Sequence, residues 1–191
     1  MARRVLHDTY FKQAKERGYR SRAAFKLKQI NESKRLINTG DAVLDLGCAP
    51  GAWIQVALEM VGDRGAVVGL DLKPIDPVPG ERSIAMVGDA FEIEPAVLLD
   101  ALRGVGMRER FDVVLSDMAP STGGHGDAER STHLCRRVLE MAPRVLNPGG
   151  SLAMKVLEGR EYQDLLHETR AQFASVKGFK PKASRDVSRE M

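Results

Sequence analysis

The chain has 191 residues, of which 43% are hydrophobic and 29% charged, and its formal net charge is +3. This balance is typical of a single globular domain and excludes a disordered chain. No apolar stretch approaches the ~20 residues that a membrane-spanning helix needs, and the basic start leads into polar sequence rather than into an apolar signal core. The two cysteines, Cys48 and Cys135, are far apart and lack metal-ligand spacing. We therefore expect a cytoplasmic protein with no membrane, metal or disulfide.

Positive charge is concentrated at the two ends of the chain. Residues 1–36 contain 11 Lys and Arg against 3 Asp and Glu, and residues 176–191 contain 5 against 2, whereas the middle is acidic. A clustered positive charge favours a polyanionic partner, although an ordinary solvated surface can carry the same residues. We expect a basic, helical, nucleic-acid-binding segment over residues 1–36 and one globular unit over residues 37–191.

Apolar patterns predict alternating strands and helices along the chain. Helical spacing runs from Ser21, a suitable N-cap, to Leu36, and a turn is expected at 147–150. The predicted strands are 43–46, 66–72, 83–87, 111–116 and 151–157, with a short one at 175–179; the later helices are 52–61, 95–105, 128–146 and 162–173. Strands buried on both faces and separated by helices predict an α/β fold, with a mostly parallel central sheet and helices on both faces.

Glycine and carboxylate residues follow the predicted strands where a ligand would bind. In a parallel sheet that place is beyond the carboxyl ends of the strands. Gly47 to Gly51 follows the first strand, and its small residues let backbone N–H groups approach a ligand. Asp71 ends the second strand and could accept ribose hydroxyls. Asp89 follows the third, where it could meet an adenine amine, and Asp117 ends the fourth.

A nicotinamide dinucleotide is the competing ligand for this outline. It requires G-x-G-x-x-G before the helix that receives the pyrophosphate, whereas Gly47 and Gly51 are spaced G-x-x-x-G with a proline between them. Each aspartate alone could be a turn or capping residue. The glycines together with three aspartates favour S-adenosylmethionine (SAM), a nucleoside with a cationic sulfonium and no phosphate, and hence a Rossmann-like SAM-dependent methyltransferase fold.

Five motifs occur in order along the chain and carry a family resemblance. They are Gly18–Leu27, Asp45–Gly51 with Trp53, Leu115–Pro120, Met154–Val156 and Ser188–Glu190. Over nearly its whole length the chain resembles the FtsJ/RrmJ family of ribose 2′-O-methyltransferases, most closely the branch that methylates a uridine of large-subunit ribosomal RNA. The resemblance implies SAM contacts at Gly51, Trp53, Asp71, Asp89 and Asp117. It also implies a catalytic tetrad of Lys26, Asp117, Lys155 and Glu190, centred on Lys155.

Two roles are open for Lys155. As a base it needs a pKa well below the usual ~10.4; burial and the charge of Lys26 would lower that pKa, whereas Asp117 and Glu190 would raise it. A charged Lys155 could instead orient the hydroxyl and stabilise developing negative charge. Trp53 could equally be a core residue.

The basic segment then provides contacts to RNA phosphates, which give affinity with little sequence reading. Its candidates are Arg3, Arg4, Lys12, Lys15, Arg17, Arg20 and Arg22. The implied partner is ribosomal RNA within the large ribosomal subunit, bound by a monomer, and residues 122–126 are expected to form a loop over the site.

Three other functions stay open. A sister branch modifies the ribose of the tRNA anticodon loop. A non-catalytic ribosome-assembly factor could keep the fold, although Lys26, Asp117 and Lys155 argue against it, and the basic segment disfavours a small-molecule methyltransferase. In this fold a hairpin strand normally follows the Ser-Arg-Glu motif, and because the sequence stops at Met191 we expect that strand to be truncated.

Overall fold

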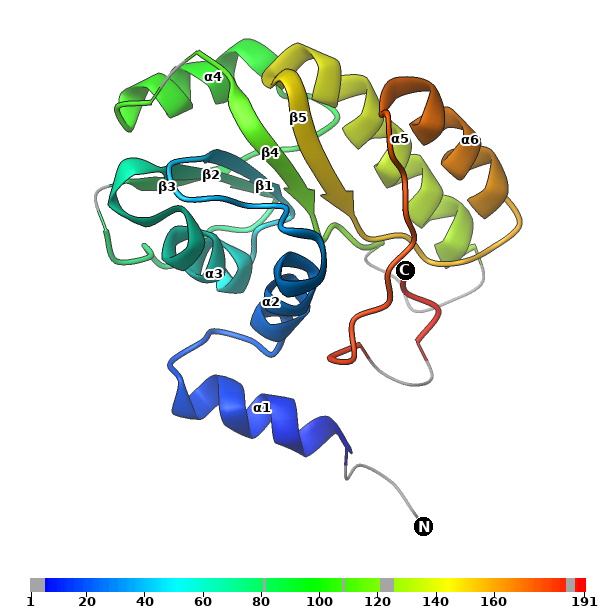
Figure 1. Cartoon of the computed structure of the whole chain (residues 1–191), viewed down its shortest axis with the longest axis horizontal. Coiled ribbons are helices and arrows are strands. Elements are labelled where there is room, and N and C mark those ends of the chain that lie inside the picture. Colours follow the sequence, from blue (N-terminus) through cyan, green and yellow to red (C-terminus); the bar gives the residue numbers. More distant parts are fainter. Residues whose placement is uncertain (1–5, 81, 108, 121–125, 185–187) are drawn as a thin grey trace.

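The computed structural model describes residues 6–80, 82–107, 109–120, 126–184 and 188–191. Five parallel strands form one sheet in the order β3-β2-β1-β4-β5 (Figure 1). The strands are β1 (Ala42–Leu46), β2 (Ala66–Asp71), β3 (Ser83–Val87), β4 (Phe111–Ser116) and β5 (Leu146–Met154). The helices are α1 (Leu6–Glu16), α2 (Ala23–Lys34), α3 (Ala52–Val61), α4 (Pro95–Gly104), α5 (Asp127–Val145) and α6 (Tyr162–Gln172), with a 3-10 turn at Gly62–Arg64.

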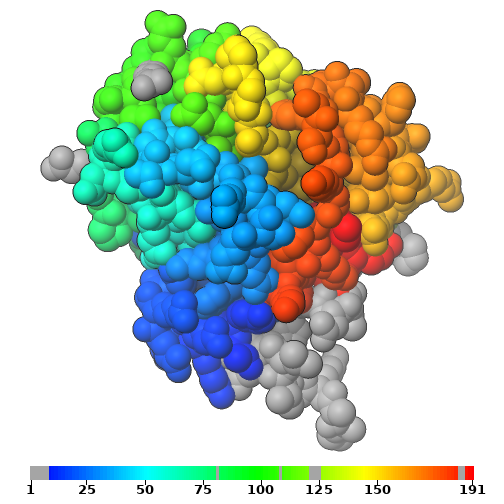
Figure 2. Space-filling view, in the orientation of Figure 1, coloured from blue at the N-terminus to red at the C-terminus, as the bar shows by residue number. Residues whose placement is uncertain are grey.

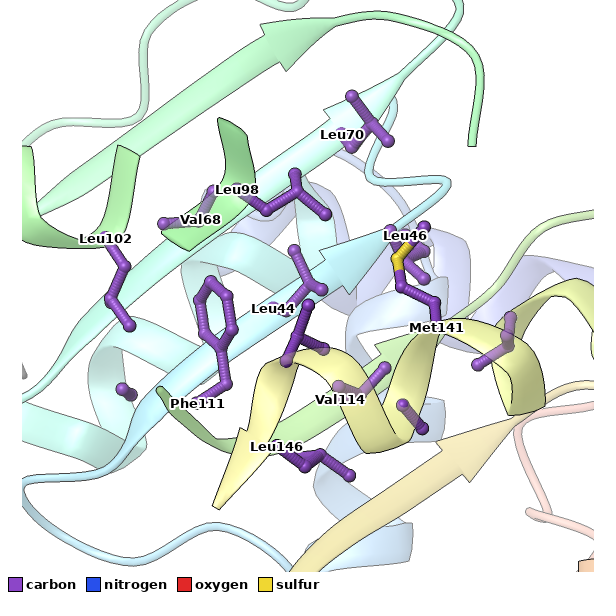
Figure 3. Close-up of a cluster of buried hydrophobic side chains, with 14 of the residues drawn as sticks. Leu44, Leu46, Val68, Leu70, Leu98, Leu102, Phe111, Val114, Met141 and Leu146 are labelled. Carbon is purple, nitrogen blue, oxygen red and sulfur yellow. The ribbon is translucent and has the colours of Figure 1, made fainter. Parts of the chain in front are cut away.

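The helices cover both faces of the sheet, as predicted. On one face, side chains of α4 and α5 pack against Leu44 and Leu46 of β1 and their neighbours (Figure 3). On the other face, α2 and α3 pack against Val43 and Val67. Alternate residues of β1 therefore point into two separate cores, which explains why the strand is apolar at nearly every position. Full burial of one such leucine or valine contributes about 1.5–3 kcal/mol to the free energy of unfolding.

The register of the central strands aligns their carboxyl ends. Leu46 of β1 pairs with Leu70 of β2 on one side and with Ser116 of β4 on the other. The next residues, Gly47, Asp71 and Asp117, therefore start at one edge of the sheet. The chain adds β2 and then β3 on one side of β1 and crosses back to place β4 on the other side. In open parallel sheets, ligands bind beyond the strand ends at such a switch point.

Three local predictions were wrong. Residues 175–179 form no strand, and the predicted turn at 147–150 lies inside β5, which starts at Leu146 and shifts its register against β4 between Phe111 and Val113. The strand β3 is not buried on both faces: Val87 is 62% exposed, because β3 is an edge strand.

The N-cap of α2 was predicted at Ser21, one residue before the observed N-cap, Arg22. The helix α2 begins at Ala23 after Arg22, and the hydroxyl of Ser21 accepts a hydrogen bond from the backbone N of Ala23 (3.2 Å).

The last residues pair with the chain that follows β5. Backbone hydrogen bonds join Val156 and Met191 in both directions (2.9 and 2.8 Å), and the backbone N of Glu158 donates to the oxygen of Arg189. The antiparallel bridge between Leu157 and Glu190 belongs to the same contact. This pairing brings the Ser-Arg-Glu motif to the carboxyl end of the sheet.

Candidate active site

The segment Gly47–Gly51, called here the cofactor loop, is fixed between β1, β2 and α3. Gly47 has a φ of +79°, and a Cβ there would lie 2.7 Å from the side chain of Met118, so the position requires glycine. The backbone N of Gly47 donates to the oxygen of Leu70 (2.8 Å). Gly51 ends the loop in the left-handed region with a φ of +99°. The loop therefore presents closely packed backbone at the carboxyl edge of the sheet.

The carboxylates after β2 and β3 organise the backbone around them. Asp71 accepts hydrogen bonds from the backbone N of Ala49 (2.9 Å) and of Lys73 (2.9 Å), so it links the cofactor loop to the end of β2. Asp89 accepts one from the backbone N of Phe91 (2.9 Å). Both residues lie at the carboxyl edge of the sheet, where the sequence placed them.

Asp45 is a site residue that the sequence analysis did not single out. It lies in β1 and is fully buried, and neither carboxylate oxygen has a hydrogen-bond partner among the described residues. Burial raises its pKa well above the usual value, and the nearby charges of Asp117 and Asp71 add to the effect. The available signal was a charged residue inside an otherwise apolar strand. Such a group, unpaired and desolvated, is suited to receive a cation.

Four side chains predicted to act together do meet, as two ion pairs. Nζ of Lys155 lies 2.8 Å from Oδ1 of Asp117 and donates to the backbone oxygen of Asp117 (2.7 Å). Nζ of Lys26 lies 2.8 Å from Oε2 of Glu190. The lysine side chains are only 12% and 11% exposed. We call these four residues the Lys-Asp-Lys-Glu cluster.

The two ion pairs also influence each other. Burial raises the pKa of Glu190, but the hydrogen bond and charge of Lys26, with the charge of Lys155, outweigh burial and hold that pKa below its usual value. The two ion pairs are thus close enough for the charge of Lys155 to act on Glu190, although their residues are far apart in sequence.

A cavity of about 1070 Å³ opens beside the cluster. All four cluster residues line it, and it continues along the free edge of β5 toward residues 172–179. Trp53 forms part of its wall; the indole is 5% exposed and its Nε1 donates to the backbone oxygen of Ala23 (2.8 Å). Trp53 therefore joins α3 to α2 next to Lys26, and its SAM contact stays a prediction.

The basic N-terminal segment packs onto the domain through α2. The ring centroids of Tyr10 and Tyr19 lie 5.4 and 5.8 Å, respectively, from that of Phe25. Both tyrosine rings therefore pack against another side chain of the protein. The amide N of Ala183 donates to Gln29 of α2 (3.0 Å), which joins the C-terminal segment to the same helix. Figure 2 shows the two segments, blue and orange, beside each other. Arg3, Arg4 and residues 121–125 lie outside the described residues.

Two negative findings concern the part of the chain that the structure describes. None of its helices has the length and apolar character to cross a membrane. Its His, Cys, Asp and Glu side chains form no group of three or more that could hold a metal ion.

Residues 19–191 match the FtsJ-like methyltransferase family. The chain belongs to this family. Proteins named "Ribosomal RNA large subunit methyltransferase E" are similar over almost all of it. The relative from Natronomonas pharaonis is 47% identical, over 96% of this chain and 71% of its own length. The relative from Methanobrevibacter smithii is 43% identical, over 97% and 87%.

Solved structures agree with the fold of this FtsJ-like methyltransferase. A crystal structure described as a ribosomal RNA methyltransferase from Plasmodium falciparum matches with a TM-score of 0.74 and 27% identity, over 86% of this chain and 93% of the other. Fibrillarin from Aeropyrum pernix, solved with bound S-adenosyl-L-methionine, matches with a TM-score of 0.52 and 18% identity, over 78% and 63%. The second match supports the fold alone.

Proposed function

We propose that this FtsJ-like methyltransferase transfers a methyl group from SAM to a ribose 2′-hydroxyl of large-subunit ribosomal RNA. The observation that carries the proposal is the Lys-Asp-Lys-Glu cluster, which lies at the carboxyl edge of the sheet and lines an open cavity. Asp117 joins the cluster to the end of β4, beside the cofactor loop that follows β1. The names of the relatives supply the substrate class.

The residues around the cofactor loop fit SAM. Asp45 offers a buried carboxylate without a hydrogen-bond partner in the described chain, and Asp71 and Asp117 are close enough to add negative charge. A ligand with an ammonium and a sulfonium group would compensate that charge, whereas a pyrophosphate would add to it. Gly51 and Asp89 complete the predicted SAM contacts at the same edge, the latter beyond β3. When bound, SAM supplies a methyl group already activated by its positive sulfur.

Lys155 is the residue proposed to handle the ribose hydroxyl. Its Nζ is held 2.8 Å from Oδ1 of Asp117. From there Lys155 would donate a hydrogen bond to the 2′-oxygen and hold that oxygen in position for methyl transfer. The new O–C bond forms as the S–C bond breaks, and the hydroxyl proton leaves to a basic group of the cluster. Positioning of this kind can contribute several kcal/mol to the lowering of the barrier.

Lys26 and Glu190 complete the proposed tetrad and line the same cavity. Their ion pair holds Glu190 ionised, so that Glu190 balances the two lysine charges and limits the repulsion between them. The basic segment over residues 1–36 would bind RNA phosphates, with residues 37–191 as the catalytic unit. We further propose that the protein acts as a cytoplasmic monomer without a metal ion.

A labelling experiment tests the substrate and the reaction together. The protein is incubated with methyl-labelled SAM and, separately, with large ribosomal subunits, free ribosomal RNA and tRNA, and the methylated ribose is mapped. We expect label on large-subunit RNA. Label on tRNA alone would refute the proposed substrate.

Variants at two positions then test the site. Lys155→Ala should lose at least about a hundredfold in kcat, a typical contribution of a group that handles a proton. Arg103→Ala, at an exposed arginine in the last turn of α4 and outside both basic ends of the chain, is the control and should keep full activity. Full activity of Lys155→Ala would remove Lys155 from the mechanism.

A further inference from the structure

Arg20 belongs to the basic segment, but its guanidinium is directed at backbone oxygens. Nη1 donates to the oxygen of Pro50 (3.0 Å) and to that of Asp76 (2.6 Å), and Nη2 donates to the oxygen of Pro77 (2.8 Å). These three acceptors come from two separate loops. A planar guanidinium with several fixed donors can bridge such acceptors, whereas the single ammonium of a lysine cannot reproduce the fork.

The backbone around Arg20 is fastened to α3 as well. Its amide N donates to Oε1 of Gln55 (2.9 Å), and Nε2 of the same glutamine donates to the oxygen of Gly18 (3.0 Å). The guanidinium also lies against Gly51: a Cβ at that glycine would be 2.6 Å from Nη1 of Arg20. The side chain therefore covers the end of the cofactor loop, where α3 begins.

Each of the two loops that Arg20 joins adjoins a proposed SAM contact: Gly51 ends one loop, and Asp71 directly precedes the other. Pro50 lies in the cofactor loop, and Asp76 and Pro77 lie in residues 72–80, called here the post-β2 loop. The post-β2 loop starts directly after Asp71. The carboxylate of Asp71 joins the same two loops, because it accepts hydrogen bonds from Ala49 and from Lys73. Arg20 thus fixes the distance between the cofactor loop and the post-β2 loop, although Arg20 is not itself a predicted SAM contact.

We propose that Arg20 is a positioning residue for SAM and couples the basic segment to SAM binding. The proposal rests on the proposed function, since it takes the carboxyl edge of the sheet to be the SAM site. It gives Arg20 a different role from the expected phosphate contact, because three of its donor bonds go to backbone oxygens of the protein. Coupling is reciprocal, so RNA held by the segment should raise the affinity for SAM, and SAM the affinity for RNA.

Three variants separate positioning from phosphate binding. Arg20→Gln removes the fork, Arg20→Lys keeps the charge, and Arg17→Gln removes the same charge from an exposed arginine whose guanidinium lies over the ring of Phe25 at 5.6 Å. Titration calorimetry measures the Kd for SAM without RNA. We expect Kd to rise at least tenfold in Arg20→Gln, to be partly restored in Arg20→Lys, and to stay within twofold in Arg17→Gln.

Binding of labelled poly(U) RNA across a salt series supplies a second readout. Loss of one phosphate contact lowers the slope of log Kobs against log salt by about 0.7 for single-stranded RNA. We expect Arg20→Gln to keep the wild-type slope, and its kcat at saturating SAM to stay within about threefold of wild type. An unchanged Kd for SAM, or a slope reduced by one contact, would overturn the proposal.

Amide hydrogen exchange without ligand keeps this inference distinct from the proposed function. Arg20→Gln should speed exchange in the cofactor and post-β2 loops and leave that of β4 unchanged. If wild type binds SAM and the variant does so equally well, Arg20 is not a positioning residue, and the proposed function stands. If the wild-type protein itself binds no SAM, the proposed function fails first, and the assignment of Arg20 to SAM fails with it.

Discussion

Nζ of Lys26 lies 2.8 Å from Oε2 of Glu190, and this ion pair joins α2 to the C-terminal segment 188–191, which pairs with the chain after β5. Both side chains are largely buried, at 11% and 23% exposed. The pair is reinforced by the backbone hydrogen bonds between Val156 and Met191, which hold the neighbouring residue against the end of β5. Residues from the two ends of the described chain thus form one part of the cavity lining.

Replacement of Glu190 by Gln should therefore affect stability in a pH-dependent way. Glu190 has a lowered pKa in the folded protein, so its contribution is fully present above the unfolded pKa of ~4.3 and is lost as pH falls through the folded value. We expect Glu190→Gln to cost about 1–2 kcal/mol at pH 7, as for a hydrogen bond to a charged group. Urea unfolding at pH 7 and pH 3 measures the difference, which should shrink toward pH 3. A loss equal at both pH values would contradict the ion-pair explanation.

Asp45 should show a trade between stability and SAM binding. Because burial raises its pKa, the folded protein binds this proton more tightly than the unfolded chain, and stability falls as pH rises above ~3.9, the unfolded value. We expect Asp45→Asn to unfold at the same or a higher temperature than wild type at pH 7.5, and the relative gain to shrink toward pH 4.

The same variant should bind SAM at least tenfold more weakly. It loses a charged partner for the cationic ligand, and an interaction of that kind is worth about 1.5–3 kcal/mol. Calorimetric titration at pH 7.5 measures the loss. Asp112→Asn is a suitable control, because Asp112 is a partly exposed acid at the opposite end of the sheet, where it accepts from the backbone N of Ala42. Equal SAM affinity of Asp45→Asn and wild type would exclude a contact with the ligand.

The sequence predicted the elements whose periodicity is unambiguous. The bounds of α3, β3 and β4 agree with the expectation to the residue, because each is a continuous apolar or helical pattern between turn residues. The start of β5 was predicted wrongly, at residue 151, because Asn147–Gly150 are turn-forming residues. In the structure these residues belong to the strand, whose register against β4 shifts there. Tertiary pairing overrides local preference there.

The sequence placed the four residues of the Lys-Asp-Lys-Glu cluster in the candidate site, but it did not single out Asp45 or predict how the four side chains pair. The family resemblance implied that Lys26, Asp117, Lys155 and Glu190 act together, whereas no local pattern says which lysine pairs with which acid. Arg20 was expected to hold phosphate because charge is the only property that sequence displays for it. Its actual partners are backbone oxygens of loops that are 30 to 57 residues away in sequence.

The two cysteines should be unreactive in the folded protein. Burial raises the pKa of Cys48 to about 12, aided by the charges of Asp45 and Asp71, and burial likewise raises the pKa of Cys135 to about 12. Since the thiolate is the nucleophile, alkylation at pH 7.5 should be negligible. Mass spectrometry after iodoacetamide treatment should find both cysteines unmodified in native protein and both modified in urea. Rapid modification of native Cys48 would show that the cofactor loop opens to solvent.

Gly47 and Gly149 form a matched pair that isolates the role of the cofactor loop. Both have a φ of +79°, so alanine at either position costs about 1–2 kcal/mol of backbone strain. A Cβ at Gly149 meets open space, whereas one at Gly47 would lie 2.7 Å from the side chain of Met118 and 2.9 Å from its backbone. Relief of that overlap must displace the loop or Met118, and overpacking of this kind costs about 1–3 kcal/mol more.

We therefore expect Gly149→Ala to lower the free energy of unfolding modestly and to keep the wild-type Kd for SAM. Gly47→Ala should lose more stability and bind SAM at least tenfold more weakly, because the backbone N–H groups of the cofactor loop move with the displaced glycine. Chemical unfolding and calorimetric titration of both variants measure the two effects. If the variants lost equal stability and both retained SAM affinity, the close contact between Gly47 and Met118 would have no part in shaping the site.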